Sequence, residues 1–433
     1  MKRLFPDYTY GPAPRQGCWW DETIAAPDWP TFPGGSQVDV AIIGGGFTGV
    51  SAALHLARNG VSVAVLEAAT PGWGASGRNG GFCCLGGSKL SHTGLARRFG
   101  EPAAERYEQA EQDAVALVAD LLSAHGIDAD THSGGETQLA HSKRAMDALR
   151  KKADASGVLH EREELLHLGF GGPFYGGYTT PVGFALNPRK YLFGLAAAAG
   201  SSGAQFFQSS PVSNIEKTRS GFELETPNGN LRADNVLVCT NGYSSENIPP
   251  WMAGRYMPAQ STVLVTRPMS EAELQAQGWT TDQMSYDSRN LLHYFRLMPD
   301  RRFLFGMRGG LLSSARAEAA IRRKVKQDFR RMFPGWADVD VTHTWSGMVC
   351  LARDLVPFVG AVPGQTGMFA GFAYHGNGVA MGTYSGRALA RLVLGQPDDL
   401  PPPMTRLPRR FPLGPWRRAL MPPAYALLAL DDL

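Results

Sequence analysis

The stretch VDVAIIGGGFTGVSAALHLARNGVSVAVLE, residues 38–67, decides the fold of this chain. Apolar residues at 38–43, several of them β-branched, predict a buried strand. A G-x-G-x-x-G motif follows at 44–49, and apolar residues then recur at the spacing of a helix. A second apolar strand at 61–66 leads directly to Glu67. Together these parts predict the βαβ unit that binds dinucleotides.

The glycines of the motif and the acid after the second strand have separate roles. Gly44 permits the tight turn, Gly46 lets a pyrophosphate approach the backbone, and Gly49 lets the helix pack closely on the strand. The start of the helix offers unpaired amides and the positive end of its dipole. Glu67 stands where a carboxylate accepts hydrogen bonds from an adenosine ribose, which argues against the 2′-phosphate of NADP. An isolated glycine motif can be a turn without a ligand, but these signals in register favour dinucleotide binding.

The composition is that of a globular chain, with 43% hydrophobic and 19% charged residues among 433, long enough for two domains. A net charge of +3 is too small to indicate a nucleic-acid partner. No apolar run approaches the length of a membrane span and no apolar region follows the first residues, so we expect no integral membrane segment and no signal peptide. Five cysteines without metal-ligand spacing predict reduced thiols in a cytoplasm and no metal site.

The order of the predicted elements indicates two interleaved domains. The pattern predicts helices at 103–126, 143–156, 191–199, 315–333 and 379–394, and strands at 132–141, 212–217, 222–226, 235–240, 291–298, 302–306 and 368–372. The block at 191–240 returns to the alternation of a nucleotide-binding domain, whereas the segments before and after it do not. Two domains built from alternating segments therefore fit the order better than two consecutive ones.

Several motifs make the chain similar to the D-amino-acid-oxidase-like flavoproteins, also called the DAO or glycine oxidase family, over roughly residues 15–400. The motifs are residues 39–49, Glu67, GASGRNGG at 74–81, CTNGY at 239–243 and the glycine loop that ends at Val379. GASGRNGG is the most specific of them. Trp19-Trp20 and HYFRLMPDRRFLFG at 293–306 resemble the branch that holds γ-glutamylputrescine oxidases and bacterial L-pipecolate oxidases.

The resemblance implies an α/β fold in which a Rossmann-like FAD-binding domain of the GR2 type is interleaved with a substrate domain built on a mixed β-sheet. Residues 1–90, 185–262 and 343–400 are expected in the FAD-binding domain, 91–184 and 263–342 in the substrate domain, and 401–433 in a C-terminal arm. The basic and apolar residues at 406–430 would also suit contact with a membrane surface, but packing on the edge of the domain is the interpretation adopted.

The resemblance also explains why one chain carries two glycine loops, because FAD is long. The first loop is expected at the pyrophosphate, and the second beneath the ribityl chain and the isoalloxazine, with Ser76 and Arg78 as donors and Asn79 as a bridge. The expected FAD contacts are Gly44, Gly46, Phe47, Thr48, Gly49, Glu67, Ala68, Ser76, Gly77, Arg78, Asn79, Gly80, Gly81, Val212, Thr240, Asn241, Gly242, Gly347, Gly376, Asn377, Gly378 and Val379. Some relatives attach FAD through a cysteine, but Gly347 rather than Cys350 stands at that position here, so we expect non-covalent FAD.

The activity implied is removal of a hydride from the carbon that bears a neutral amine, which gives an imine, with reoxidation by dioxygen to hydrogen peroxide. The substrate implied is a small-molecule amine or amino acid, either L-pipecolate-like or γ-glutamylputrescine-like. A flavin dehydrogenase that passes electrons to a quinone or another carrier is the alternative. An NAD-dependent dehydrogenase would share the first glycine loop but would not need the second glycine loop or the late glycine loop.

Candidates for the substrate site lie on the strand that the resemblance places over the flavin. Alternation puts Tyr294 and Arg296 on one face, where an arginine fork beside a tyrosine suits a carboxylate. Arg308 is a second candidate, and a surface salt bridge is the plain alternative for each arginine. Relatives often have histidine directly before the last Gly-Val, whereas this chain has Asn377 there and His375 two residues earlier. His375 is therefore either an active-site residue or a hydrogen-bonded residue behind the site.

Overall fold

The computed structural model describes residues 1–396 and 400–432, so the last residues before the predicted boundary at 400 and the end of the predicted arm lie outside it. The predicted βαβ unit is confirmed as β1 (Ser36–Ile43), α3 (Phe47–Ala57) and β2 (Val63–Leu66), with β1 and β2 parallel. Gly44 has φ +106°, and a Cβ there would come 2.8 Å from the carbonyl oxygen of Cys239. A Cβ on Gly49 would come 2.0 Å from the Gly44 oxygen, so the helix can approach the loop this closely only with glycine.

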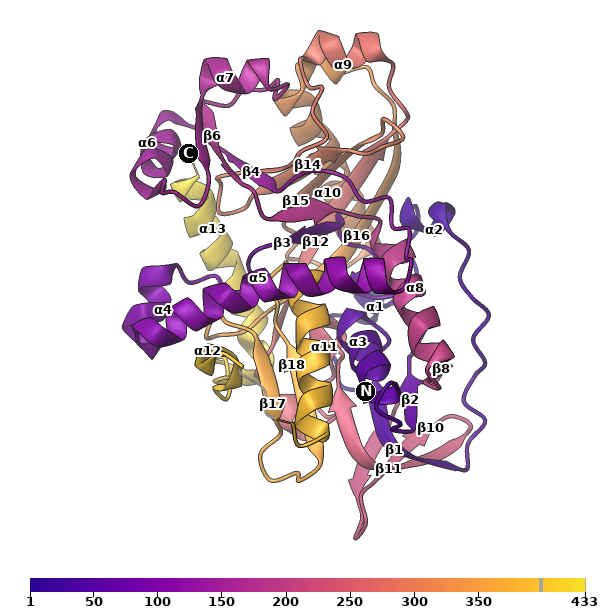
Figure 1. Ribbon diagram of the computed structural model, residues 1–433. Coiled ribbons are helices and arrows are strands. Elements are labelled where there is room, and N and C mark those ends of the chain that lie inside the picture. Colours follow the sequence, from indigo (N-terminus) through magenta and orange to yellow (C-terminus); the bar gives the residue numbers. More distant parts are fainter. Residues whose placement is uncertain (397–399, 433) are drawn as a thin grey trace.

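The first sheet has the strand order β17-β18-β11-β1-β2-β8, with β10 and β9 continuing from β11 (Figure 1). Its other members are β8 (Gln205–Phe207), β9 (Asn214–Lys217), β10 (Phe222–Thr226), β11 (Gly229–Val238), β17 (Phe358–Ala361) and β18 (Met368–Phe372). Strands β18, β11, β1, β2 and β8 are parallel. Helices α3, α8 (Pro188–Ser201) and α11 (Ala380–Val393) pack together on one face, and the long α5 (Glu101–Ala124) lies against α11.

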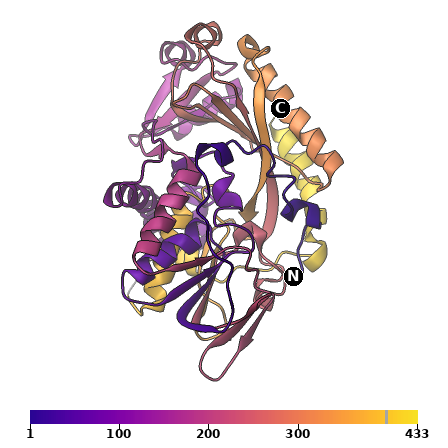
Figure 2. The same cartoon turned by 90° about the vertical axis from the view of Figure 1, so that its right-hand side faces the viewer.

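The second sheet has the order β16-β12-β15-β14-β13-β4-β6-β5 and is antiparallel except between β13 and β4. Its strands are β4 (Glu136–Leu139), β5 (Val158–Glu161), β6 (Gly176–Thr180), β12 (Met257–Thr266), β13 (Met284–Asp287), β14 (His293–Leu297), β15 (Phe303–Arg308) and β16 (Val341–Leu351). Helix α10 (Ala315–Met332) covers one face through an aromatic core that includes Phe295, Phe329 and Trp336. Figure 2 shows this helix beside the long strands.

The remaining elements are short and connect or flank the sheets. They are α1 (Asp7–Tyr10), α2 (Trp20–Thr23), η1 (Ala75–Gly77), β3 (Phe82–Cys84) paired with β7 (Gly183–Ala185), α4 (His92–Phe99), α6 (Lys143–Lys152), α7 (Arg162–His167), η2 (Asn241–Tyr243), η3 (Pro250–Met252), α9 (Glu271–Gln277), η4 (Pro334–Trp336), α12 (Pro402–Thr405), η5 (Gly414–Leu420) and α13 (Met421–Asp431). Within the described ranges, no helix combines the length and the apolar character that crossing a membrane requires.

The two sheets take alternating segments of the chain, as the order of predicted elements indicated. Two predicted boundaries, at 262/263 and 342/343, however, cut through strands of the second sheet. Strands β12 and β16 pair from Met257–Leu351 to Thr266–Val341, so all of both strands belongs to that sheet. The sequence shows where strands begin and end only weakly, because pairing between distant segments sets their length.

Candidate active site

A single cavity of about 1190 Å³ lies where the carboxyl ends of the first sheet meet the second sheet. It joins the first glycine loop, the second glycine loop and the late glycine loop to side chains of β14 and β15. The predicted cofactor residues that line it are Gly44, Gly46, Phe47, Thr48, Glu67, Ala68, Ser76, Arg78, Asn79, Gly80, Val212, Thr240, Asn241, Gly347, Gly376, Asn377, Gly378 and Val379. The cavity therefore follows the path expected for a long dinucleotide.

Four predicted FAD contacts do not line this cavity: Gly49, Gly77, Gly81 and Gly242. A Cβ on Gly77 would come 2.2 Å from the Gly72 oxygen, and one on Gly81 would come 1.9 Å from the Leu186 oxygen. Gly77 and Gly81 thus allow close packing of the loops behind the cavity, and a direct contact of the four glycines with FAD stays a prediction.

Glu67 is positioned by the first loop at the end of β2. Its Oε2 accepts a hydrogen bond from the Gly45 amide at 2.8 Å, and its Oε1 accepts one from the Ala69 amide at 3.0 Å. Burial raises the pKa of this carboxyl, and the amide hydrogen bonds act in the opposite direction. Glu67 thus closes the turn of the first loop while its side chain still lines the cavity.

Ser76 and Asn79 shape the second glycine loop. The Ser76 Oγ accepts a hydrogen bond from the Phe47 amide at 3.0 Å and so ties the second loop to the first turn of α3. The Asn79 Nδ2 donates to the Ala75 and Ser76 carbonyls, and its Oδ1 accepts from the Gly81 amide at 2.8 Å. The side-chain amide of Asn79 is therefore engaged within the loop itself.

Arg78 is buried and keeps one nitrogen without a partner. Its Nε donates to the Trp73 carbonyl at 2.8 Å, its Nη1 donates to the Ser346 carbonyl at 3.1 Å, and its guanidinium lies 4.0 Å from the Trp73 ring centroid. Its Nη2 has no hydrogen-bond partner among the described residues. An unpartnered buried donor of a cationic group beside a cavity fits a cofactor oxygen, because leaving it unpaired is costly.

The carbonyls of the second loop are held from outside the cavity, one residue after another. The oxygens of residues 77–80 accept in turn from Cys18 Sγ, Trp345 Nε1, Trp20 Nε1 and Arg296 Nε. The Gly81 oxygen accepts from the Leu186 amide. Two of the donors come from the N-terminal segment and the other three from distant parts of the chain, so the loop is fixed along its whole length.

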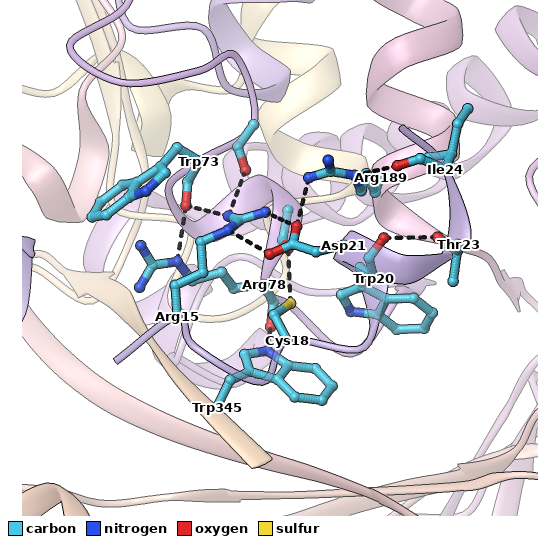
Figure 3. A network of polar contacts seen from close by, with 12 residues as sticks. Arg15, Cys18, Trp20, Asp21, Thr23, Ile24, Trp73, Arg78, Arg189 and Trp345 are labelled. Atoms are coloured by element: carbon cyan, nitrogen blue, oxygen red, sulfur yellow. Dashed lines mark hydrogen bonds and ion pairs between the residues drawn. The ribbon is translucent and has the colours of Figure 1, made fainter. Parts of the chain in front are cut away.

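The N-terminal segment supplies much of this support (Figure 3). Arg15 and Arg78 converge on the Trp73 carbonyl, where Arg15 Nη1 donates at 2.7 Å. Asp21 is an ion-pair partner of both Arg15 and Arg189. Sequence reasoning noted Trp19-Trp20 only as part of a resemblance, because no local pattern shows what an indole donor contacts.

Arg296 lies away from the cavity, which corrects its predicted role as the carboxylate receptor. Its Nε donates to the Gly80 carbonyl at 3.0 Å, its Nη2 to the Leu186 carbonyl at 2.8 Å, and its Nη1 to His132 Nε2 at 2.7 Å. The side chain is only 1% exposed, and burial lowers its pKa to about 9. The second loop covers this end of β14, so Arg296 supports that loop.

His375 is also engaged by backbone groups. Its Nδ1 donates to the Gly87 carbonyl at 2.6 Å, and its Nε2 accepts from the Ala352 amide at 3.0 Å. Burial lowers the pKa of the ring to about 3, so the imidazole is neutral. Both ring nitrogens are occupied, which rules against proton transfer by His375 and supports the alternative of a residue that holds the late glycine loop.

Tyr294 and Arg308 line the cavity, as His375 does, and of the predicted active-site residues only Arg296 does not. The Tyr294 hydroxyl lies 3.1 Å from Ser261 Oγ. One Nη of Arg308 donates to the His375 carbonyl at 2.9 Å, and the side chain has no carboxylate partner among the described residues. Burial lowers the pKa of Arg308, but an arginine remains charged at neutral pH.

Sequence reasoning missed a group of ionisable residues that share the cavity with Arg308, namely Lys89, Glu111 and Glu136. Burial raises the pKa of Glu136 to about 7 and that of Glu111 to about 8. Lys89 is close enough to both acids to lower these pKa values in part. No local signal in the sequence could have found the two acids. Glu111 lies on the long helix α5 and Glu136 on the strand β4, and both elements also carry ordinary polar residues.

Comparisons with known proteins identify the family. Residues 39–392 match the family model described as DAO, FAD dependent oxidoreductase. This chain belongs to the DAO family. The family is FAD-dependent, and its members act on the CH–N groups of amines and amino acids, so this DAO-family protein is an FAD-dependent oxidoreductase of that kind.

Two curated relatives of this DAO-family protein cover most of its length. The probable oxidoreductase OrdL of Rhizobium meliloti (strain 1021) is 33% identical over 396 residues, which is 88% of this chain and 89% of that protein. The gamma-glutamylputrescine oxidoreductase of Escherichia coli (strain K12) is 28% identical over 369 residues, 83% of this chain and 84% of that protein.

Solved structures share the fold of this DAO-family protein. Glycine oxidase from Geobacillus kaustophilus has a TM-score of 0.68 at 21% identity and covers 84% of this chain and 96% of its own. L-proline dehydrogenase from P. horikoshii has the same TM-score at 18% identity, covering 86% of this chain and 96% of its own. The α/β fold with a Rossmann-like FAD-binding part, predicted from the sequence, is confirmed.

Proposed function

We propose that this protein is an oxidase that removes a hydride from the carbon next to nitrogen of a small amino or imino acid, or of a carboxylate-bearing amine. L-Pipecolate-like and γ-glutamylputrescine-like compounds represent the two classes of substrate. The products are an imine and, after reoxidation by dioxygen, hydrogen peroxide. The observation that supports this proposal is Arg308, a half-buried cation without a carboxylate partner among the described residues, in the cavity that the glycine loops also line.

Arg308 would hold the substrate carboxylate through the planar fork of its guanidinium, and Tyr294 would add a hydroxyl to the same region. Glu111 and Glu136 would attract the amine end of the substrate once they are ionised. The hydride leaves only from a carbon next to a neutral amine, so a carboxylate with a pKa near 7 is a suitable place for the proton of the ammonium form.

The cofactor would be held by the residues that line the other part of the cavity. The amides at the start of α3, Glu67 and Arg78 would meet its nucleotide and phosphate groups, and the late glycine loop before α11 would meet its ring. When bound, FAD supplies the acceptor for the hydride. We also propose that FAD is bound without a covalent link.

A dehydrogenase that passes electrons to a quinone or another carrier is the second candidate. A glycine oxidase and an L-proline dehydrogenase both share this fold, so the fold is compatible with either acceptor. We propose dioxygen as the acceptor. We also propose the cytoplasm as the location, in line with the buried, unpaired state of all five cysteines.

The test is anaerobic bleaching of the flavin by a panel of simple amines, cyclic imino acids, N-methylated amino acids and γ-glutamyl amines. We expect bleaching by carboxylate-bearing compounds and slower bleaching by their amides, followed by rapid reoxidation in air. Arg308→Lys should lose the preference for acid over amide, because lysine keeps the charge but not the fork. Arg302→Lys, a change outside the cavity lining, should keep it. Equal bleaching by acids and amides in the unaltered protein would overturn the proposal.

A further inference from the structure

The C-terminal helix α13 contributes to the cavity although it lies beyond the residues that match the family model. Tyr425 and Leu428 of this helix line the cavity together with Arg308. They are three residues apart, so they share one side of the helix. The opposite side carries Leu427 and Leu430, which are 69% and 66% exposed. One side of α13 therefore faces the cavity and the other faces outward.

Both ends of α13 are held in place. Before its start, Arg417 is completely buried and donates to both carboxylate oxygens of Glu246, at 2.9 and 2.6 Å. At its end, the Asp432 carboxylate accepts from the backbone amides of Asn290 and Leu291, at 2.6 and 3.0 Å. In Figure 1 the yellow helix rises from the half that holds the first sheet toward α6 and β6 of the other half. It thus bridges the two parts of the molecule beside the cavity.

The aromatic ring of Tyr425 packs beside the apolar cluster formed by Met257, Ala259 and Met421. Its hydroxyl is near enough to Arg308 for the guanidinium charge to lower the pKa of the phenol, although burial raises that pKa by more. The phenol therefore stays protonated, with a hydroxyl that can donate to a carboxylate.

We propose that α13 forms one wall of the substrate site, on which the Tyr425 hydroxyl donates to the same substrate carboxylate that Arg308 binds. This inference rests on the proposed function of Arg308. The guanidinium of Arg308 is held from the other side by the His375 carbonyl, at 2.9 Å. The specificity of the enzyme is then set in part by a segment outside the family domain.

The first test titrates the FAD-loaded protein with benzoate and with benzamide and follows the flavin absorbance. Tyr425→Phe removes only the hydroxyl, so we expect benzoate to bind roughly three- to tenfold more weakly, the net effect of about one hydrogen bond, with benzamide binding unchanged. Leu427→Ala, on the outward side of the same helix, should stay within about twofold of the unaltered protein. Equal benzoate affinities for both variants and the unaltered protein would overturn the inference.

The second test uses chemical labelling and needs no catalysis. All five native cysteines are buried, so the unaltered protein gives a low background with a maleimide. Benzoate should slow the labelling of Leu428→Cys severalfold and leave the labelling of Leu427→Cys unchanged. Equal protection or no protection at the two positions would show that α13 is not a wall of the site. If the unaltered protein does not prefer benzoate to benzamide, the proposed function fails first and this inference fails with it.

Discussion

Four successive carbonyl oxygens in the second glycine loop, from Gly77 to Gly80, each accept a hydrogen bond from a different side chain. A buried carbonyl without a donor destabilises the fold, so each of these donors stabilises the loop by more than its packing alone. Arg296 is one of them, and its position shows how far residue-level prediction reaches. The face of β14 was predictable from alternation, but the loop that covers Arg296 lies 216 residues away in sequence.

At the residue scale, Arg296→Lys should reduce stability and FAD retention and leave substrate selection intact. Lysine can replace at most part of the three hydrogen bonds, so we expect the free energy of unfolding to fall by about 2–3 kcal/mol, in the range for one buried acceptor left unsatisfied. Thermal unfolding and the FAD content of the purified protein measure this. Arg308→Lys is the matched comparison and should show the opposite pattern. A loss of acid-over-amide preference in Arg296→Lys would contradict the assignment.

The raised pKa values of Glu136 and Glu111 predict a pH dependence of carboxylate binding. Both acids are neutral well below pH 7. Each becomes negative as the pH passes its pKa, about 7 for Glu136 and about 8 for Glu111, so the repulsion of a carboxylate grows with pH. At an effective dielectric constant of about 20, a like charge elsewhere in the same cavity contributes on the order of 1–1.5 kcal/mol. The dissociation constant of benzoate should therefore rise roughly tenfold per ionised acid between pH 6 and pH 9.

Glu136→Gln removes one of the two charges and should flatten this profile, with little effect at pH 6, where the native carboxyl is already neutral. Flavin absorbance titrations at several pH values supply the data. A profile in the variant identical to that of the unaltered protein would show that Glu136 does not share the site with the carboxylate.

At the scale of elements, prediction succeeded where the signals are local. The first βαβ unit was predictable because the turn, the helix and the acid all lie within thirty residues of each other. The acids of the cavity were not predictable, because they reach it through contacts between distant elements. Glu136 is placed by the pairing of β4 with β13, and Glu111 by the packing of α5. The support of the second loop by α2 was equally hidden, because hydrogen bonds from an indole leave no periodic pattern.

The short helix α2 provides a prediction of its own. Trp20→Phe keeps an aromatic ring but removes the donor to the Asn79 carbonyl, which we expect to cost about 1–3 kcal/mol of stability and to weaken FAD binding. Its neighbour gives the control, because Trp19 packs on Arg302 and His343 through its ring, so Trp19→Phe should change little. Thermal unfolding and FAD dissociation rates distinguish the two. Equal effects would mean that ring packing, not the donor, matters.

At the scale of the whole molecule, the cavity collects residues from the N-terminal third, the middle and the C-terminal arm. Cys350 also lines it, but this thiol is buried, and burial raises its pKa to about 12, so little of the reactive thiolate forms at neutral pH. Gly347, at the position where some relatives carry the linking cysteine, lies against the side chain of Arg78.

These observations support the prediction of non-covalent FAD. Precipitation of the holoprotein with acid should release all the yellow colour into the supernatant, because nothing but folded structure would retain the cofactor. Flavin that remains with the washed pellet would contradict the prediction and direct attention to Cys84, Cys239 or Cys350, the cysteines that line the cavity.

The long pairing of β12 with β16 has a consequence for engineering. These strands run through the second sheet and reach the cavity, which is lined by Ser261 and Val263 of β12 and by residues 347–351 of β16. A chimaera that exchanges the substrate-recognising part between relatives must therefore transfer both strands whole, with its seams near 256/257 and 351/352. Seams at 262 and 343 would join strand halves from two parents inside one ladder. We expect such hybrids to aggregate during expression, whereas hybrids with the outer seams remain monodisperse.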